Sequence, residues 1–281
     1  MATVEETLTA QAVTGSVVES APLSRHLQRV IIHAPGLDRL QLPLSADTAL
    51  GIYFASPQDP APTGRTYTVR KHDLSAARII VDVVLHGDAA GTRWATGAAP
   101  GDRVGLAHPK SWFRPPHYAD RHVLVADLAG LPAISGLIEG CVHSDITAIV
   151  EVRDEDDLDY LPKRLGLRLI SSIGTGNGET ESVLPALVAK HCSATDVGYC
   201  WFAGEASTAR TVRKLLRHEQ GWTTDQIDVV GYWRHNSDQW SDRFAPHGPR
   251  MYSIYEKSIT DGKSEKVALE EFDDALERLG L

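Results

Sequence analysis

The sequence predicts two domains of different class, a small antiparallel β-barrel followed by a parallel α/β domain, and then a C-terminal helix. Short strands separated by turn residues fill the chain up to about residue 116. A Phe-Arg-Pro-Pro segment at 113–116 then interrupts the pattern. Beyond it, short apolar runs alternate with helical segments, which is the order of βαβ units and therefore of a parallel sheet.

The barrel is predicted within residues 1–116, where helical signals are scarce and apolar and polar residues alternate. The strand candidates cover residues 13–20, 27–33, 65–70, 79–86 and 103–107. Turn clusters at 56–60 and 99–102, both containing Pro and Asp, separate them. Several short strands with such punctuation favour a small antiparallel barrel.

The α/β domain is placed at residues 117–236. Its strand candidates are apolar runs that we interpret as buried, at 122–126, 146–152, 167–171, 199–203 and 227–232. Segments with helical spacing lie between the strands, at 131–141, 182–191 and 205–219. Sheets of this kind bind nucleotides at the carboxyl ends of their strands, so a ligand site is expected there.

A tail at 237–281 follows the second domain. It ends in an amphipathic stretch whose apolar residues recur at helical spacing, namely Ala268, Leu269, Phe272, Ala275, Leu276 and Leu279. This predicts a helix. A single apolar stripe favours a helix that packs on its own protein, with a partner-binding helix as the alternative.

Composition excludes several classes of protein. The chain has 281 residues, with 28 Lys and Arg against 37 Asp and Glu, a net charge of −9 that disfavours nucleic-acid binding. Its three cysteines form no C-x-x-C or C-x-x-H pair, so we expect no zinc site, no four-cysteine iron–sulfur cluster and no disulfide framework. No metal ligands of its own are predicted.

The sequence also predicts a cytoplasmic location. Residues 1–10 are polar and carry Glu5 and Glu6 where an export signal would be basic and then apolar. The most apolar stretch, 123–138, is broken by Asp127 and by a Gly-Leu-Pro turn, which makes it too short to cross a bilayer. Unpaired cysteines fit a reducing compartment.

The strand at 65–70 carries residues suited to a nucleotide cofactor. If the strand is regular, Arg65, Tyr67 and Val69 share one face, and Thr66, Thr68 and Arg70 share the other. An arginine can pair with a phosphate, a tyrosine can cover an aromatic ring and a threonine can donate to a ring nitrogen. From spacing alone, a surface strand with two solvated arginines is the favoured interpretation.

Residues 85–95 run from a strand into a loop of small residues and then into a short helix. Exposed N–H groups at such a helix start can take a pyrophosphate. Taken alone, this segment is better interpreted as a tight turn that leads into a helix.

Three other features have structural interpretations. The Gly-Thr-Gly-Asn-Gly segment at 174–178 lacks dinucleotide spacing and is interpreted as a flexible loop. Ser207 is expected to satisfy N–H groups at a helix start, with a nucleophile as the alternative. The acidic segment 151–159 is interpreted as a solvated loop, with a calcium site as the alternative. Signature motifs of P-loop nucleotidases, α/β-hydrolases and zinc proteases are absent from the sequence.

Several of these segments together form one recognisable pattern. After Arg65, Tyr67, Thr68 and Arg70 come Val84-Leu85-His86-Gly87, Thr92-Arg93-Trp94-Ala95, Pro100-Gly101-Asp102, Asp127-Leu128-Ala129-Gly130-Leu131-Pro132-Ala133, Ala203-Gly204-Glu205-Ala206-Ser207 and Gly231-Tyr232-Trp233-Arg234. The set resembles the siderophore-interacting proteins, FAD-dependent ferric-siderophore reductases related to the ferredoxin reductase fold. The resemblance spans about residues 12–236, in order.

The resemblance implies a six-stranded FAD-binding barrel, an NAD(P)H-binding α/β domain and electron transfer from NADH or NADPH through flavin to a ferric siderophore. It implies that Arg65 meets the FAD pyrophosphate, that Tyr67 lies against the isoalloxazine and that Thr68 bonds near flavin N5. Tyr67 and Thr68 are thereby its catalytic candidates. Thr92 would support the pyrophosphate, with His86 and Arg70 toward the nucleotide. The remaining cofactor candidates are Val69, Gly87, Gly91, Trp94, Asp127, Ala129, Pro132, Gly204, Glu205, Ala206, Ser207 and Trp233.

Two departures from the family pattern lie at the nucleotide edge. Leu128 and Ala129 replace a Glu and a Thr, which removes two polar side chains, and Ala89-Ala90 replaces a Gly-Pro. Anionic siderophores call for a cationic pocket near the flavin, for which the candidates are Lys71, Lys110, Arg114 and Arg234; solvated surface charge is the alternative for each. A flavoprotein that exchanges electrons with a ferredoxin-type partner and a non-catalytic ferric-siderophore binder are the alternative functions.

Overall fold

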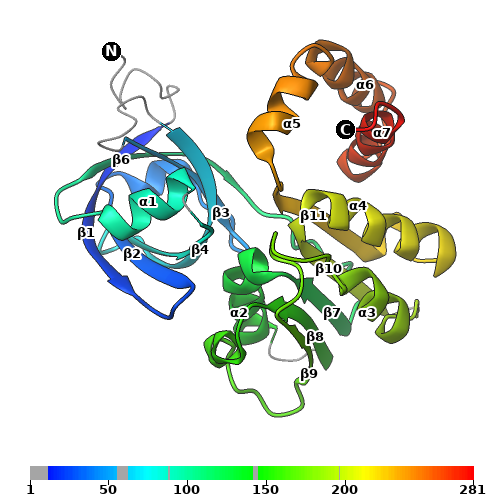
Figure 1. The fold of residues 1–281 in the computed structure, drawn as a ribbon, viewed down its shortest axis with the longest axis horizontal. Coiled ribbons are helices and arrows are strands. Elements are labelled where there is room, and N and C mark those ends of the chain that lie inside the picture. The colour runs from blue at the N-terminus through cyan, green and yellow to red at the C-terminus, as the bar shows by residue number, and fades with distance from the viewer. Residues whose placement is uncertain (1–11, 56–62, 88, 142–144, 196) are drawn as a thin grey trace.

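The computed structural model describes residues 12–281 apart from 56–62, 88, 142–144 and 196. The predictions for residues 1–10 and for the turn at 56–60 fall outside these residues. Figure 1 shows a barrel, a sheet flanked by helices and a separate group of C-terminal helices. Among the described residues, no helix is both long enough and apolar enough to span a membrane.

The barrel closes in the order β1-β2-β5-β4-β3-β6, and all its strand pairs are antiparallel. Its strands are β1 (Val13–Pro22), β2 (Leu27–His33), β3 (Ala49–Phe54), β4 (Thr63–Asp73), β5 (Arg78–Val84) and β6 (Arg103–Lys110). The predicted barrel is thus confirmed. Strand β3 had not been predicted, because nearly all of its residues are buried and its sequence does not alternate.

Helix α1 (Ala90–Gly97) packs against β1, β2 and β5 of the barrel. Its Trp94 is buried and stacks on Phe54 of β3, with ring centroids 4.5 Å apart and an interplanar angle of 10°. Helix α1 is therefore fixed against the barrel by an aromatic pair, which stabilises the contact by more than its buried area alone.

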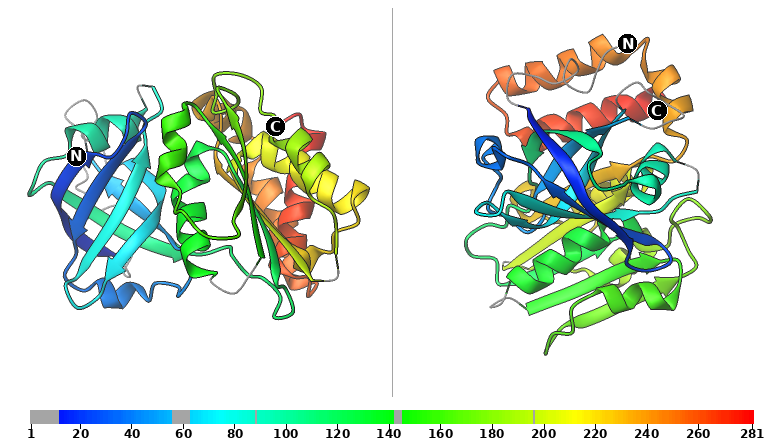
Figure 2. Two further views of the ribbon diagram at one scale, coloured as in Figure 1. Left: turned by 90° about the horizontal axis from the view of Figure 1, so that it is seen from below. Right: turned by 90° about the vertical axis from the view of Figure 1, so that its left-hand side faces the viewer.

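The second domain is a parallel sheet of order β11-β10-β7-β8-β9. Its strands are β7 (Arg121–Ala126), β8 (Asp145–Val152), β9 (Arg168–Ile173), β10 (Gly198–Glu205) and β11 (Ile227–Trp233). Helix α2 (Leu131–Gly140) lies between the sheet and the barrel, whereas α3 (Leu184–His191) and α4 (Ala206–Lys214) cover the other face (Figure 2). The predicted α/β class is confirmed, and a π-helical turn, Leu215–Glu219, extends α4.

Two sequence interpretations in this domain are wrong. Strand β9 is not buried: it forms the sheet edge, and Leu169 and Ile173 are 41% and 47% exposed. The acidic segment 151–159 is not a solvated loop, because Glu151 lies within β8 and Asp157 is buried. The Asp157 carboxylate bonds His26 Nδ1 of the barrel at 3.0 Å. This segment therefore helps to hold the two domains together.

Other polar contacts also join the domains. Arg70 of β4 pairs with Glu139 of α2 at 2.5 Å and donates to Ser135 at 3.0 Å. Asp47, fully buried, accepts hydrogen bonds from the backbone N–H groups of Trp112 and Phe113, both at 2.7 Å. The link between the domains is thereby fixed to the barrel.

The tail forms three helices, α5 (Ser237–Phe244), α6 (Gly248–Thr260) and α7 (Glu265–Arg278). The predicted C-terminal helix corresponds to α7, whose Ala268, Ala275 and Leu276 are buried. Helix α7 packs on α6 and forms ion pairs with α4. The tail therefore packs on its own protein, as predicted.

Candidate functional site

Strand β4 and the start of α1 form one side of the candidate site. The Tyr67 ring lies 5.7 Å from the Trp94 ring, and its hydroxyl reaches Gly91, where a Cβ would lie 2.3 Å from that oxygen. Burial raises the pKa of Tyr67 above its ordinary value, so it is a neutral phenol. Arg65 is exposed, two residues earlier on β4.

The turn before α1 leaves the first helical N–H groups without a side-chain cap. Ala89, the residue before the helix, is extended and has no side chain able to accept. Gly87 adopts a left-handed φ of +45°, and the Thr92 hydroxyl accepts from His86 N at 2.9 Å. The Thr92 hydroxyl thus holds the backbone at His86 in place and does not cap the helix.

An uncapped helix start with an exposed arginine on the neighbouring strand suits an anionic group. Tyr67 offers a partly buried aromatic ring close to this start. The residues present therefore fit FAD.

Two other β4 candidates are buried. Val69 belongs to the barrel core, and Thr68 is only 6% exposed. Thr68 lies near the hydroxyl of Tyr232, which is itself buried without a hydrogen-bond partner among the described residues.

Asp127 stands at the carboxyl end of β7, close to the barrel. Its carboxylate accepts from Ala129 N at 2.9 Å, Glu205 N at 2.8 Å and Trp233 Nε1 at 2.6 Å. Burial raises the pKa of Asp127 to about 7, although these hydrogen bonds oppose the shift. Trp233 also stacks on His86 of the barrel, with ring centroids 5.4 Å apart. Burial lowers the pKa of His86 to about 4, so the ring is neutral at pH 7.

Glu205 caps helix α4. Its carboxylate accepts from the backbone N–H groups of Ser207 and Thr208, and Ser207 donates its hydroxyl to the same oxygen. The expectation that Ser207 satisfies this helix start is therefore wrong. Ala206 begins the helix, and Gly204 lies beside Asp127, where a Cβ would lie 2.9 Å from Oδ2. Pro132 occupies the first turn of α2.

A cavity of about 770 Å³ opens at the carboxyl ends of the sheet strands, next to Asp127 and Trp233. The loop 174–178, interpreted above as flexible, forms part of its wall. Asn177 is buried, accepts from Leu128 N at 3.0 Å and donates to the Glu151 carbonyl at 3.3 Å. Sequence reasoning missed Glu151 and Asn177 as lining residues. The available sequence signal was an Asn between two glycines, a pattern typical of left-handed backbone, and Asn177 does adopt a left-handed φ of +56°.

The four cationic candidates do not form one free cluster. Lys71 is exposed, and Lys110 lies over the Trp112 ring at 5.3 Å. Arg234 lies over the Trp240 ring at 4.1 Å. Arg114 is paired with Asp228 and Glu265, both at 2.8 Å.

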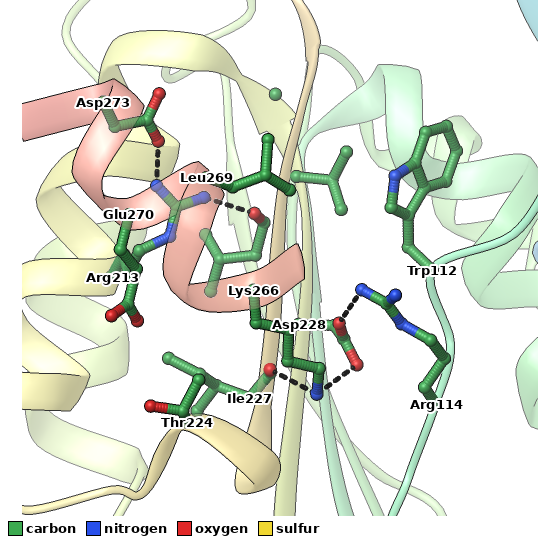
Figure 3. Close-up of a pocket in the computed structure, with 13 residues that line it drawn as sticks. Trp112, Arg114, Arg213, Thr224, Ile227, Asp228, Lys266, Leu269, Glu270 and Asp273 are labelled. Atoms are coloured by element: carbon green, nitrogen blue, oxygen red, sulfur yellow. Dashed lines mark hydrogen bonds and ion pairs between the residues drawn. The ribbon is translucent and has the colours of Figure 1, made fainter. Parts of the chain in front are cut away.

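Arg114 borders a second, smaller cavity of about 220 Å³ between β11 and α7 (Figure 3). Lys266 of α7 bonds Asp228 at 2.9 Å, and Arg213 bonds Asp273 and the Val229 carbonyl. The charged groups in this cavity are thus paired with one another, and they attach α7 to the sheet edge.

A closed antiparallel barrel before a parallel nucleotide-binding sheet is the fold of ferredoxin reductase-like flavoproteins. A ferredoxin NADP+ reductase from Neisseria gonorrhoeae, solved with FAD and NADP bound, superposes with a TM-score of 0.63 at 15% identity, over 80% of this chain and 100% of that one.

A family model described as siderophore-interacting FAD-binding domain matches residues 42–113, and one described as siderophore-interacting protein matches residues 119–236. The chain belongs to the siderophore-interacting protein family. It is 26% identical over 235 residues to ferric acinetobactin reductase of Acinetobacter baumannii, covering 80% of this chain and 77% of that protein. The siderophore-interacting protein structure from the same organism superposes with a TM-score of 0.73 at 21% identity, covering 86% of this chain and 99% of that one.

Proposed function

We propose that this protein is an FAD-dependent ferric-siderophore reductase that takes electrons from NAD(P)H. The observation that carries the proposal is the juxtaposition of two sites across the domain boundary. We call Arg65, Tyr67 and the first N–H groups of α1 the β4–α1 cradle. This cradle meets the carboxyl edge of the sheet where His86 stacks on Trp233. A hydride donor bound at the sheet edge and a flavin bound on the barrel would meet there. The kinship with ferric acinetobactin reductase supports a ferric siderophore as the acceptor.

The chain's own residues serve to bind, orient and exclude water. Arg65 and the first N–H groups of α1 hold the pyrophosphate, while Tyr67 supports the ring system and Thr68 lies along the same strand. Trp233, anchored by Asp127, covers the site from the sheet side. When bound, FAD supplies the step between two-electron hydride chemistry and single-electron transfer to iron.

Iron release follows from the chemistry of the substrate. Hard anionic oxygens bind Fe(III) far more tightly than Fe(II), so one-electron reduction lowers the affinity of the siderophore for the metal. A competing ligand can then capture the Fe(II). Such a reaction suits the cytoplasm, where a ferrous product is used, and this location forms part of the proposal.

The proposal also covers the residues that contact the siderophore and the identity of the electron donor. Lys71 and Lys110 remain candidates for contacting an anionic siderophore, since neither forms an ion pair recorded among the described residues. Arg114 is a weaker candidate because two carboxylates already pair with it. A ferredoxin-type donor is an alternative to NAD(P)H.

The test is anaerobic electron transfer with purified, FAD-loaded protein. The flavin absorbance should bleach on addition of NADH or NADPH and return on addition of a ferric siderophore, with Fe(II) captured by a ferrous chelator. A flavin that is reduced by reduced ferredoxin but by neither nucleotide would replace NAD(P)H with a protein donor. A reduced flavin that does not respond to ferric siderophore would leave only the non-catalytic binder.

A further inference from the structure

The 770 Å³ cavity contains a carboxylate at the position that distinguishes the two nicotinamide nucleotides. In parallel nucleotide-binding sheets, an acidic residue about 20 positions after the first turn accepts hydrogen bonds from the adenosine ribose hydroxyls, whereas a nearby arginine accommodates a 2′-phosphate. Here the first turn begins at Asp127, and Glu151 follows it by 24 residues (151 − 127). Glu151 is the second-to-last residue of β8, the second strand of the domain.

Glu151 has one oxygen fixed by the protein and one without a partner. Its Oε1 accepts from Thr175 Oγ1 and from Val183 N, both at 2.8 Å. Its Oε2 has no hydrogen-bond partner among the described residues, although the side chain is fully buried. Gly176 gives this oxygen room, because a Cβ there would lie 1.9 Å from it. An unpartnered buried carboxylate oxygen is costly unless a ligand hydroxyl completes its hydrogen bonding.

The charge of the cavity opposes an additional phosphate. Its described lining includes Glu179, Glu181 and Glu205 as well as Glu151 and Asp127, and contains neither lysine nor arginine. Two of the helix starts at its edge are already capped by carboxylates, Asp127 and Glu205. The pyrophosphate is common to NADH and NADPH. The 2′-phosphate, which adds about two negative charges, is therefore what this environment discriminates against.

Arg153 is the arginine closest in sequence to Glu151, and its guanidinium already has partners within the protein. Its Nη2 pairs with Glu179 at 3.0 Å and its Nη1 donates to the Leu85 carbonyl at 3.2 Å. The side chain is only 16% exposed. Glu179 thus holds a guanidinium that a 2′-phosphate could otherwise use.

We propose that Glu151, with Glu179 holding Arg153, makes this nucleotide pocket select NADH over NADPH. The inference rests on the proposed function, because it assigns the donor of that same reaction. It places the adenosine ribose at the end of β8, with a ribose hydroxyl donating to Glu151 Oε2.

The selectivity for NADH over NADPH can be tested by measuring ligand binding directly, without enzymatic turnover. Isothermal titration calorimetry of the FAD-loaded protein with ADP-ribose and with 2′-phospho-ADP-ribose compares ligands that differ only in that phosphate. ADP-ribose should bind at least about tenfold more tightly. Equal or tighter binding of the phosphorylated ligand would overturn the proposal, as would failure of both ligands to bind.

Variants show which side chains cause the discrimination between ADP-ribose and 2′-phospho-ADP-ribose. Glu151→Gln keeps the shape of the side chain and an oxygen for Val183 N, and should reduce the discrimination about tenfold. Glu179→Gln, which frees Arg153, should raise the affinity for 2′-phospho-ADP-ribose without changing that for ADP-ribose. The matched control is Glu219→Gln, an exposed carboxylate outside the cavity lining, which should change neither. Unchanged discrimination in both cavity variants would refute the assignment.

The proposed function is tested separately. Flavin reduced by dithionite, with excess reductant removed, should be reoxidised by a ferric siderophore whichever nucleotide the pocket prefers. A protein that passes this assay but prefers 2′-phospho-ADP-ribose contradicts the selectivity proposal alone. Folding of each variant is confirmed by circular dichroism and FAD content.

Discussion

Trp233 donates its indole N–H to Asp127 at 2.6 Å, across 106 residues of sequence. Asp127 directly follows β7 and Trp233 ends β11, and β10 lies between these two strands in the sheet. Because Trp233 also stacks on His86, this hydrogen bond joins the carboxyl edge of the sheet to the barrel. The proposed meeting point of nucleotide and flavin is built on this pair.

Asp127 should make the protein less stable as the pH rises. Its pKa is about 7 in the folded protein, against an ordinary value of 3.8, so the folded state binds more protons between these values. The free energy of unfolding should therefore fall from about pH 4 to about pH 7, by at most about 1.4 kcal/mol per pH unit from this group. Asp127→Asn should flatten this dependence. Urea unfolding at pH 5 and pH 8 measures it, and an unchanged difference in the variant would contradict the assignment.

Arg65 should contribute to cofactor affinity. Arg65→Ala removes an exposed guanidinium of β4 and should weaken FAD binding about ten- to a hundredfold, as expected for a charge-assisted phosphate contact. Fluorescence titration of the apoprotein with FAD measures the dissociation constant. Arg78→Ala, an exposed arginine at the start of β5, is the matched control and should leave it unchanged. Equal affinities for Arg65→Ala and wild type would exclude Arg65 from the cradle.

Gly91 should be needed for the position of Tyr67. In Gly91→Ala the new methyl group meets the Tyr67 hydroxyl, so the ring must shift, at a cost of about 1–3 kcal/mol of stability and with weaker FAD binding. Gly97→Ala in the same helix meets nothing within 4 Å and should be neutral or slightly stabilising. Chemical unfolding of both variants provides the comparison. Equal stabilities would show that the contact with Tyr67 is not a constraint.

The ion pair between Arg213 and Asp273 should stabilise the docked tail. Both side chains are mostly buried, at 14% and 26% exposed. A double-mutant cycle to alanine should give a coupling energy of about 1–2 kcal/mol that decreases in 1 M salt. Lys263 and Glu271, within the tail and more exposed, should give less than about 0.5 kcal/mol. Equal couplings for the two pairs would contradict the role assigned to burial.

The sequence predicted most strands because their apolar patterns are strong. Strand β2 begins and ends at the predicted residues, 27–33. Strand β3 was missed because a strand buried on both sides does not alternate. Helices α5 and α6 were missed because they are polar, and much of the tail's packing is within the tail itself.

The site was only partly predictable for a different reason. The motifs located the cradle residues, but a sequence does not show which polar groups are already satisfied. Glu205 instead of Ser207 caps α4, and Arg114 is paired with two carboxylates. The sequence placed Glu151 in a solvated acidic segment, whereas in the structure it is buried in the cavity wall. These outcomes depend on tertiary contacts between distant residues.

The proposed reaction is electron transfer through a bound flavin to a ferric siderophore. The most direct measurement is the anaerobic visible spectrum of FAD-loaded protein, reduced stoichiometrically and then mixed with a ferric siderophore and a ferrous chelator. We expect the oxidised flavin bands to return while the chelate of Fe(II) appears, two irons for each flavin fully reduced. Retained flavin that stays reduced, with no Fe(II) formed, would contradict it.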